Sequence, residues 1–162
     1  MPLKSRGFFS LPSRHRGFTL IEIMVAVVVL AIGLLGLAGL QATSLRFNNS
    51  AYHRSQATNL AYDIVDRMRV NRQRAIETPT GTVEGYDGWA CNDPPACVAG
   101  LVPAGTTLAE QDMEAWCNAL ACTLPLGTGG ITRTGNVFTI SIQWDDDRDG
   151  VLNPPFDMDT EL

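Results

Sequence analysis

The chain has 162 residues and a net charge of −5, from 12 basic and 17 acidic side chains. Residues 1–17 hold four basic residues and no acid, whereas the rest holds eight basic residues against all 17 acids, a net of −9. This acidic balance lacks the basic face that nucleic-acid binding requires, so no nucleic-acid partner is expected. The length suggests one globular core plus an extended element.

A long apolar segment follows the basic leader. Phe18–Leu40 contains a single charged residue, Glu22. As a helix this segment would measure about 34 Å at 1.5 Å per residue, enough to cross a hydrocarbon core of about 30 Å. It is also longer than the apolar region of a cleaved signal peptide. Basic residues ahead of such a span predict a cytoplasmic N-terminus.

The helical pattern continues beyond the apolar segment. No proline lies between Pro12 and Pro79, so we predict one helix from Phe18 to about Glu77, apolar all round in its first half and amphipathic in its second. An apolar stripe at three- and four-residue steps marks the second half. Its members are Ala57, Ala61, Ile64, Val65 and Met68.

The rest of the chain predicts a small α+β domain, in which a short helix and a small antiparallel sheet pack on the long helix. Leu108–Leu120 is typical of a short helix, and Val137–Trp144 alternates apolar and polar residues as a strand does. A turn near Gly135 would join that strand to another near Ile131. The expected regions are 1–17, a basic leader; 18–40, the apolar helix; 41–78, its amphipathic half; and 79–162, the globular domain.

All four cysteines lie in the globular domain. An even number beyond a translocated segment predicts two disulfides, and the spacing fits paired zinc knuckles poorly. Metal binding and free thiols are the alternatives. Three pairings are possible, and the local pairs Cys91–Cys97 and Cys117–Cys122 are favoured. The second pair requires a helix that ends near Leu120, because residues five apart in a continuous helix are too distant to bridge.

An acidic stretch near the C-terminus has the D-x-D-x-D-G spacing that begins an EF-hand-like calcium loop, with Gly150 at the sharp turn. The twelfth loop position is Phe156 where such loops carry Glu, so a later carboxylate would have to substitute. The alternative is an acidic, solvated hairpin end. The predicted ligands are Asp145, Asp147, Asp149, Val151 through its carbonyl, Asn153 and Asp157.

Gly17, followed by Phe18-Thr19-Leu20-Ile21-Glu22, resembles the processing site of type IV prepilins. The resemblance implies that a membrane peptidase cleaves between Gly17 and Phe18, that Phe18 is N-methylated, and that the helix is retained. It also implies that Glu22 recruits a subunit by pairing with the terminal amine of another subunit. A carboxylate is favoured near a helix N-terminus, and in apolar surroundings it requires a cation.

Ala57–Arg72 and the pattern of Asp112, Trp116, Leu120 and a strand ending at Trp144 resemble PilV-type minor pilins. Gly39 lies where major pilins usually carry a proline. The resemblance implies a type IV pilin-like fold and a minor subunit for pilus assembly, twitching motility and adhesion. It implies other pilins, the prepilin peptidase and the inner-membrane assembly platform as partners. The globular domain would be periplasmic before assembly and part of the extracellular pilus afterwards. No cofactor is expected to be required, although the acidic stretch could bind calcium.

Three other protein classes share part of this pattern. A minor pseudopilin of a type II secretion system would share the processing site and the helix. A bitopic receptor would explain the span and the outer domain but neither Gly17 nor Glu22. An enzyme is not expected, because His15 and His53 lie in the leader and the helix, and no nucleophile elbow, H-E-x-x-H or P-loop motif occurs.

Overall fold

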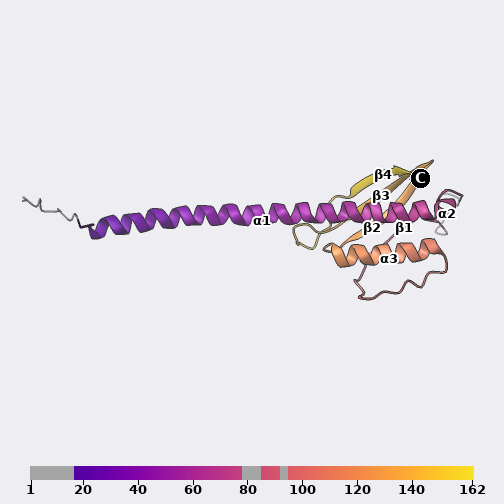
Figure 1. Ribbon diagram of the computed structural model, residues 1–162, viewed down its shortest axis with the longest axis horizontal. Helices are drawn as coiled ribbons and strands as arrows, with labels where there is room; N and C mark the ends of the chain where they lie inside the picture. Colours follow the sequence, from indigo (N-terminus) through magenta and orange to yellow (C-terminus); the bar gives the residue numbers. More distant parts are fainter. Residues whose placement is uncertain (1–16, 78–84, 92–94) are drawn as a thin grey trace, which may run out of the picture. The chain divides into compact units, whose positions relative to one another are not determined.

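The computed structural model describes residues 17–77, 85–91 and 95–162 (Figure 1). Contacts divide the chain into two compact units, Met1–Thr43 and Ser44–Leu162. The helices and strands are α1 (Leu20–Val70), α2 (Arg72–Glu77), β1 (Trp89–Ala90), α3 (Leu108–Thr123), β2 (Thr128–Thr134), β3 (Val137–Gln143) and β4 (Phe156–Glu161).

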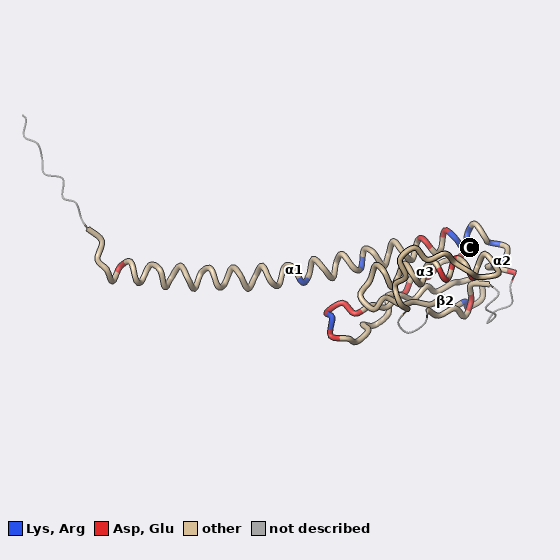
Figure 2. Tube along the Cα trace, turned by 90° about the horizontal axis from the view of Figure 1, so that it is seen from below, with Lys and Arg blue, Asp and Glu red and all other residues tan. Residues whose placement is uncertain are grey.

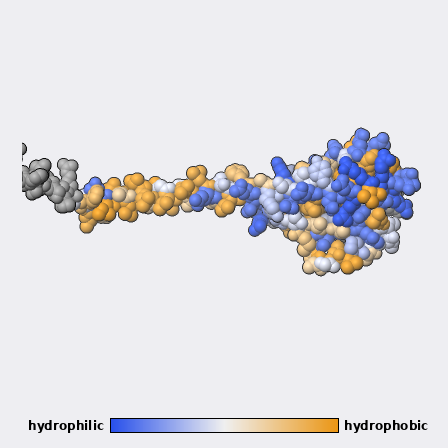
Figure 3. Space-filling model, viewed as in Figure 1, coloured by the Kyte–Doolittle hydropathy of each residue, from blue (hydrophilic) through white to orange (hydrophobic). Residues whose placement is uncertain are grey.

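In the first unit, the described residues 17–43 are all exposed, and from Leu20 onward they form the N-terminal part of α1. This helix is long and apolar enough to cross a membrane, and none of its most apolar stretch is buried within the protein. Figure 3 shows this part of α1 as a mainly hydrophobic surface. An apolar surface of this extent marks contact with lipid or other proteins.

The long helix differs from the prediction at both ends. It begins at Leu20 instead of Phe18, and it is interrupted at Asn71, so that residues 72–77 form the separate helix α2. Asn is a poor helix former because its side chain competes for hydrogen bonds. Here Asn71 Nδ2 donates to the Tyr86 hydroxyl at 3.3 Å. The helical path still continues, because Ala75 N donates to Asn71 O at 3.1 Å.

The second unit is built on a four-stranded antiparallel sheet in the order β1-β2-β3-β4. The predicted turn between β2 and β3 is present, with Gly135 at a φ of 64°, which glycine adopts without strain. The apolar residues of β3 point into the core, where Ile140 and Ile142 are fully buried. The α+β architecture predicted from the sequence is therefore confirmed.

Helices α1 and α3 complete this core. The whole predicted stripe of α1 is fully buried, as are Met113, Trp116 and Leu120 of α3. The Trp116 indole N–H donates to the Leu60 carbonyl at 2.9 Å, which fixes α3 directly against α1. Tight packing also explains Gly129, where an added Cβ would lie 2.8 Å from both the Ser141 carbonyl oxygen and the Trp116 ring.

Strand β4 was not among the predicted elements. Its acidic residues, Asp157, Asp159 and Glu161, are exposed, whereas Phe156 and Met158 on the opposite face pack against the core. The period-2 alternation of these residues is the signal that a strand leaves in a sequence. Three acids in six residues mask it, because Asp and Glu are disfavoured in strands.

The predicted disulfide pairing is wrong. The bridges are Cys91–Cys117 and Cys97–Cys122, with Cα–Cα distances of 5.5 and 4.8 Å. Helix α3 continues to Thr123, past the expected end near Leu120. Cys117 and Cys122 therefore lie five residues apart in one helix and cannot reach each other. Each instead bridges to a cysteine of the preceding segment.

Candidate functional site

The predicted cleavage position lies just ahead of α1. Gly17 and Phe18 are exposed and outside regular secondary structure, and Phe18 is 78% exposed. Thr19 caps the helix, because its hydroxyl and its carbonyl both accept from Glu22 N, at 3.3 and 3.1 Å. The bond between Gly17 and Phe18 is thus in exposed, non-helical backbone.

Glu22 is the third residue of α1 and is exposed. It lies four residues after Phe18, and both residues border the same shallow apolar hollow beside Ile23. Among the described residues Glu22 has no ion-pair partner. A carboxylate on an apolar stretch of helix is suited to pairing with a cation.

Three of the predicted calcium ligands converge in the loop after β3. Asp145, Asp147 and Asp149 each offer a carboxylate oxygen, and these oxygens lie within 4.8 Å of one another. Asp145 is 4% exposed. Its two oxygens accept from Asp149 N at 3.2 Å and Gly150 N at 2.8 Å, with Gly150 at a φ of 86°. Carboxylate oxygens at this spacing fit the coordination that calcium prefers.

The other predicted ligands are arranged differently. Asn153 Oδ1 accepts from Asp146 N at 2.7 Å and so closes the loop on itself. Val151 follows the turn, and its N–H donates to Asp149 Oδ1 at 2.8 Å. Asp157 lies on β4 opposite Ser141 and is not in the carboxylate group. Calcium binding by this loop remains a prediction from the sequence.

The acidic loop is attached to α1 by a residue that the sequence did not single out. Asp146 Oδ1 accepts from the Trp144 indole N–H at 3.1 Å. Burial opposes ionisation of Asp146, but hydrogen bonds from Ser50 and Trp144, with the nearby charge of Arg54, hold its pKa below the usual range. A groove of about 480 Å³ lies here, lined in part by Arg46, Asn49 and Arg148.

Figure 2 shows that the charged residues among those described are spread over the second half of α1 and the rest of the second unit, with a run of them in the loop after β3. The first part of α1 carries only Glu22. The basic residues near the end of α1 are largely paired: Arg67 with Asp63 at 3.0 Å, and Arg69 with Asp66 at 2.8 Å. Their arrangement is structural, as expected for a solvated helix face.

Two family models match the chain. A model described as the prokaryotic N-terminal methylation motif matches residues 12–38, and a model described as type IV pilin Tt1218 matches residues 39–114. The first contains the predicted processing site and Glu22; the second extends from the apolar part of α1 into α3. No match was found among curated proteins or among solved structures.

Proposed function

Because the chain is a type IV prepilin, we propose that it functions as a minor subunit of a type IV pilus. The observation that carries the proposal is the exposed carboxylate of Glu22, which has no ion-pair partner among the described residues and lies in the otherwise apolar first part of α1, within the processing motif. An isolated charge in apolar surroundings costs several kcal/mol unless a cation accompanies it. Pairing with a subunit's N-terminal amine would explain why it is present.

Processing and assembly would then follow in order. The prepilin peptidase cleaves between Gly17 and Phe18 and methylates the new amine, which keeps its charge. Before assembly the apolar part of α1 anchors the chain in the inner membrane, with the N-terminus cytoplasmic and the globular unit periplasmic. With the assembly platform, the chain then enters a filament of major and minor pilins, in which other helices cover the exposed apolar surface.

Two observations support a minor rather than a major subunit. Helix α1 continues without a break through Gly39, where major pilins usually carry a proline. The stretch Ala57–Arg72 and the pattern around Trp116 resemble PilV-type minor pilins. In that role the chain contributes to pilus initiation, twitching motility and surface adhesion, and it has no enzymatic activity of its own.

Deletion of the gene tests this proposal. Surface pili and twitching should both decrease and should return when the wild-type gene is supplied. Normal piliation and twitching with a loss of protein secretion would instead identify a pseudopilin of a type II secretion system. Retention of Met1 in the membrane-inserted chain, read by N-terminal sequencing, would identify a bitopic receptor.

A further inference from the structure

The two disulfides lie in different environments. Cys91 is buried in the core, where its N–H donates to the Gly129 carbonyl at 2.8 Å, and its partner Cys117 packs against that core. Cys97 and Cys122 are both exposed. The first bridge, the core disulfide, therefore joins the residue after β1 to the half-buried Cys117 of α3. The second, the surface disulfide, is exposed on α3.

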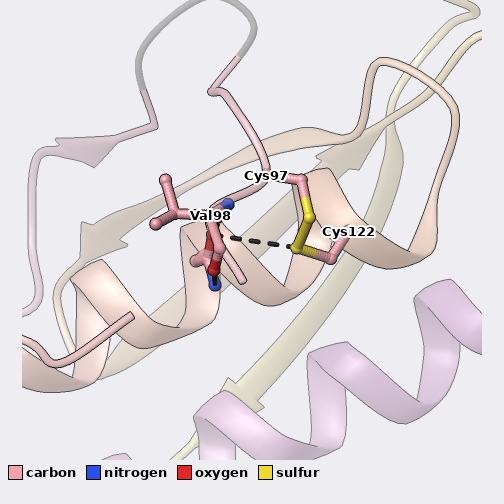
Figure 4. The surroundings of a disulfide bond; sticks show 4 residues. Cys97, Val98 and Cys122 are labelled. Atoms are coloured by element: carbon pink, nitrogen blue, oxygen red, sulfur yellow. Dashed lines mark hydrogen bonds between the residues drawn. A yellow bond between two sulfur atoms is a disulfide. The ribbon is translucent and has the colours of Figure 1, made fainter. Parts of the chain in front are cut away.

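The surface disulfide fastens a loop whose other attachments to α3 are hydrogen bonds. We call residues 95–107 the stapled loop; it contains no charged residue. Asn118 of α3 accepts from Val98 N at 2.8 Å and donates to Val98 O at 3.1 Å. Figure 4 shows the Cys97–Cys122 bridge joining the chain beside Val98 to α3.

At its far end the stapled loop is held by Glu114, whose Oε2 accepts from Ala104 N at 2.7 Å and from Gly105 N at 3.3 Å. Between these two attachments the loop pairs with no strand, and Val98 and Val102 are 48% and 82% exposed. Segments with few buried contacts and exposed hydrogen bonds open at low free-energy cost. The other attachments of the stapled loop to α3 are hydrogen bonds, so the surface disulfide is the covalent bond that restrains the loop.

We propose that the surface disulfide is a redox-sensitive clasp, which a dithiol reductant opens while the core disulfide stays closed. A thiolate of the dithiol attacks Sγ of Cys97 or Cys122 and displaces the other sulfur as a thiolate. The second thiol of the reductant then resolves the mixed disulfide. The reductant leaves as a disulfide, and the protein gains two electrons and two protons as two thiols.

Opening the clasp changes one defined surface. A groove of about 330 Å³ is lined by Ala96 and Leu101 of the stapled loop, and by Trp89 and the two core-disulfide cysteines, Cys91 and Cys117, of the elements beside it. Release of the loop widens this groove and uncovers Trp89, whereas the sheet and the contact of α3 with α1 are retained by the core. The clasp is independent of the proposed pilus function, because it uses no residue of the processing or assembly site.

The test is a titration of the full mature chain, in detergent micelles, with dithiothreitol. Free thiols are alkylated at each step and located by peptide mapping. Cys97 and Cys122 should become labelled at about tenfold lower reductant concentration than Cys91 and Cys117. At that point the amides of Val98 and Ala104 should lose protection from hydrogen exchange, while β3 keeps its protection. Simultaneous reduction of the two bridges, or protected loop amides after reduction, would overturn the proposal.

Paired variants provide the control. The double variant Cys97→Ser/Cys122→Ser should fold, with β3 amides protected and the loop amides already unprotected in the absence of reductant. The matched variant Cys91→Ser/Cys117→Ser should lose stability in the core. If the surface variant fails to fold, the surface disulfide is part of the framework and the clasp is rejected.

Discussion

The Tyr86 hydroxyl donates a 2.6 Å hydrogen bond to Asp112 Oδ2 inside the second unit. Tyr86 is fully buried and Asp112 is 8% exposed. Arg67 of α1 also contacts this carboxylate, at 3.4 Å. The pKa of Tyr86 is raised well above its ordinary value, by burial first and then by the bond to Asp112. The pair thus joins α3 to the segment before β1, with α1 as a third partner.

Removing the hydroxyl should destabilise the second unit. Tyr86→Phe leaves a buried carboxylate without its shortest donor, and a hydrogen bond to a charged group contributes about 1.5–3 kcal/mol. Chemical denaturation of the full chain in detergent measures the loss. Tyr62→Phe is the control, because Tyr62 is 55% exposed on α1 and its variant should be nearly neutral. Equal stability of the two variants would contradict this account of Asp112.

The capping box of α3 predicts a dependence on pH. Hydrogen bonds from the Thr106 hydroxyl and from the Thr106 and Thr107 amides hold the pKa of Glu110 below its ordinary value. A carboxyl whose pKa is lower in the folded state stabilises at pH above its unfolded value of about 4.3 and loses that effect as pH falls further. Glu110→Gln should therefore flatten the fall of stability below this pH. Glu161→Gln on β4 should keep the wild-type dependence of stability on pH. An unchanged pH dependence in Glu110→Gln would show that the capping box does not cause it.

We expect efficient processing to require glycine, which has no side chain, at position 17. Gly17→Ala should be cleaved in part, and Gly17→Phe should not be cleaved, because a bulky side chain next to the scissile bond obstructs the peptidase. Intact-mass spectrometry of the protein purified from the membrane fraction distinguishes the 162-residue precursor from the chain that begins with methylated Phe18. Complete cleavage of Gly17→Phe would contradict the assigned position.

Glu22→Ala separates assembly from processing. The variant should be cleaved and inserted normally, since it removes a costly charge from the apolar helix. Its incorporation into sheared pili should fall, because a terminal amine loses its carboxylate. Glu77→Ala, an exposed acid of α2, is the matched control and should be incorporated like the wild type. Wild-type levels of Glu22→Ala in pili would leave its carboxylate without a role.

The features that could be predicted from sequence were those with a local periodic signal. The alternation of β3 correctly placed Ile140 and Ile142 in the core, and three- and four-residue steps did the same for the α1 stripe. The disulfide pairing could not be predicted this way, because it depends on where the loop passes α3. For the same reason, no sequence pattern indicated that Asn118 and Glu114 hold the stapled loop.

The candidate sites also differ in how far a local sequence pattern could locate their residues. The processing motif is contiguous, so Gly17, Phe18 and Glu22 could be located without a structure. The acidic loop was located by spacing as far as Asp149. The position of Asp157 depends on how β4 pairs with β3, and that pairing directs it to the exposed face of the sheet, opposite Ser141.

The last prediction concerns calcium at the acidic loop. If Asp145, Asp147 and Asp149 bind the ion, calcium relieves the repulsion among three neighbouring carboxylates. These carboxylates are brought together only in the folded chain, so calcium should stabilise the folded state. At a hundredfold excess over the dissociation constant, the free energy of unfolding should rise by about 2.7 kcal/mol. Asp147→Ala should abolish most of this gain, whereas Glu161→Ala, outside the loop, should retain it. Magnesium should have a smaller effect, since it demands a tighter octahedral cage. Identical melting curves in millimolar calcium and in chelator would reduce the loop to an acidic hairpin end, closed only by its own hydrogen bonds.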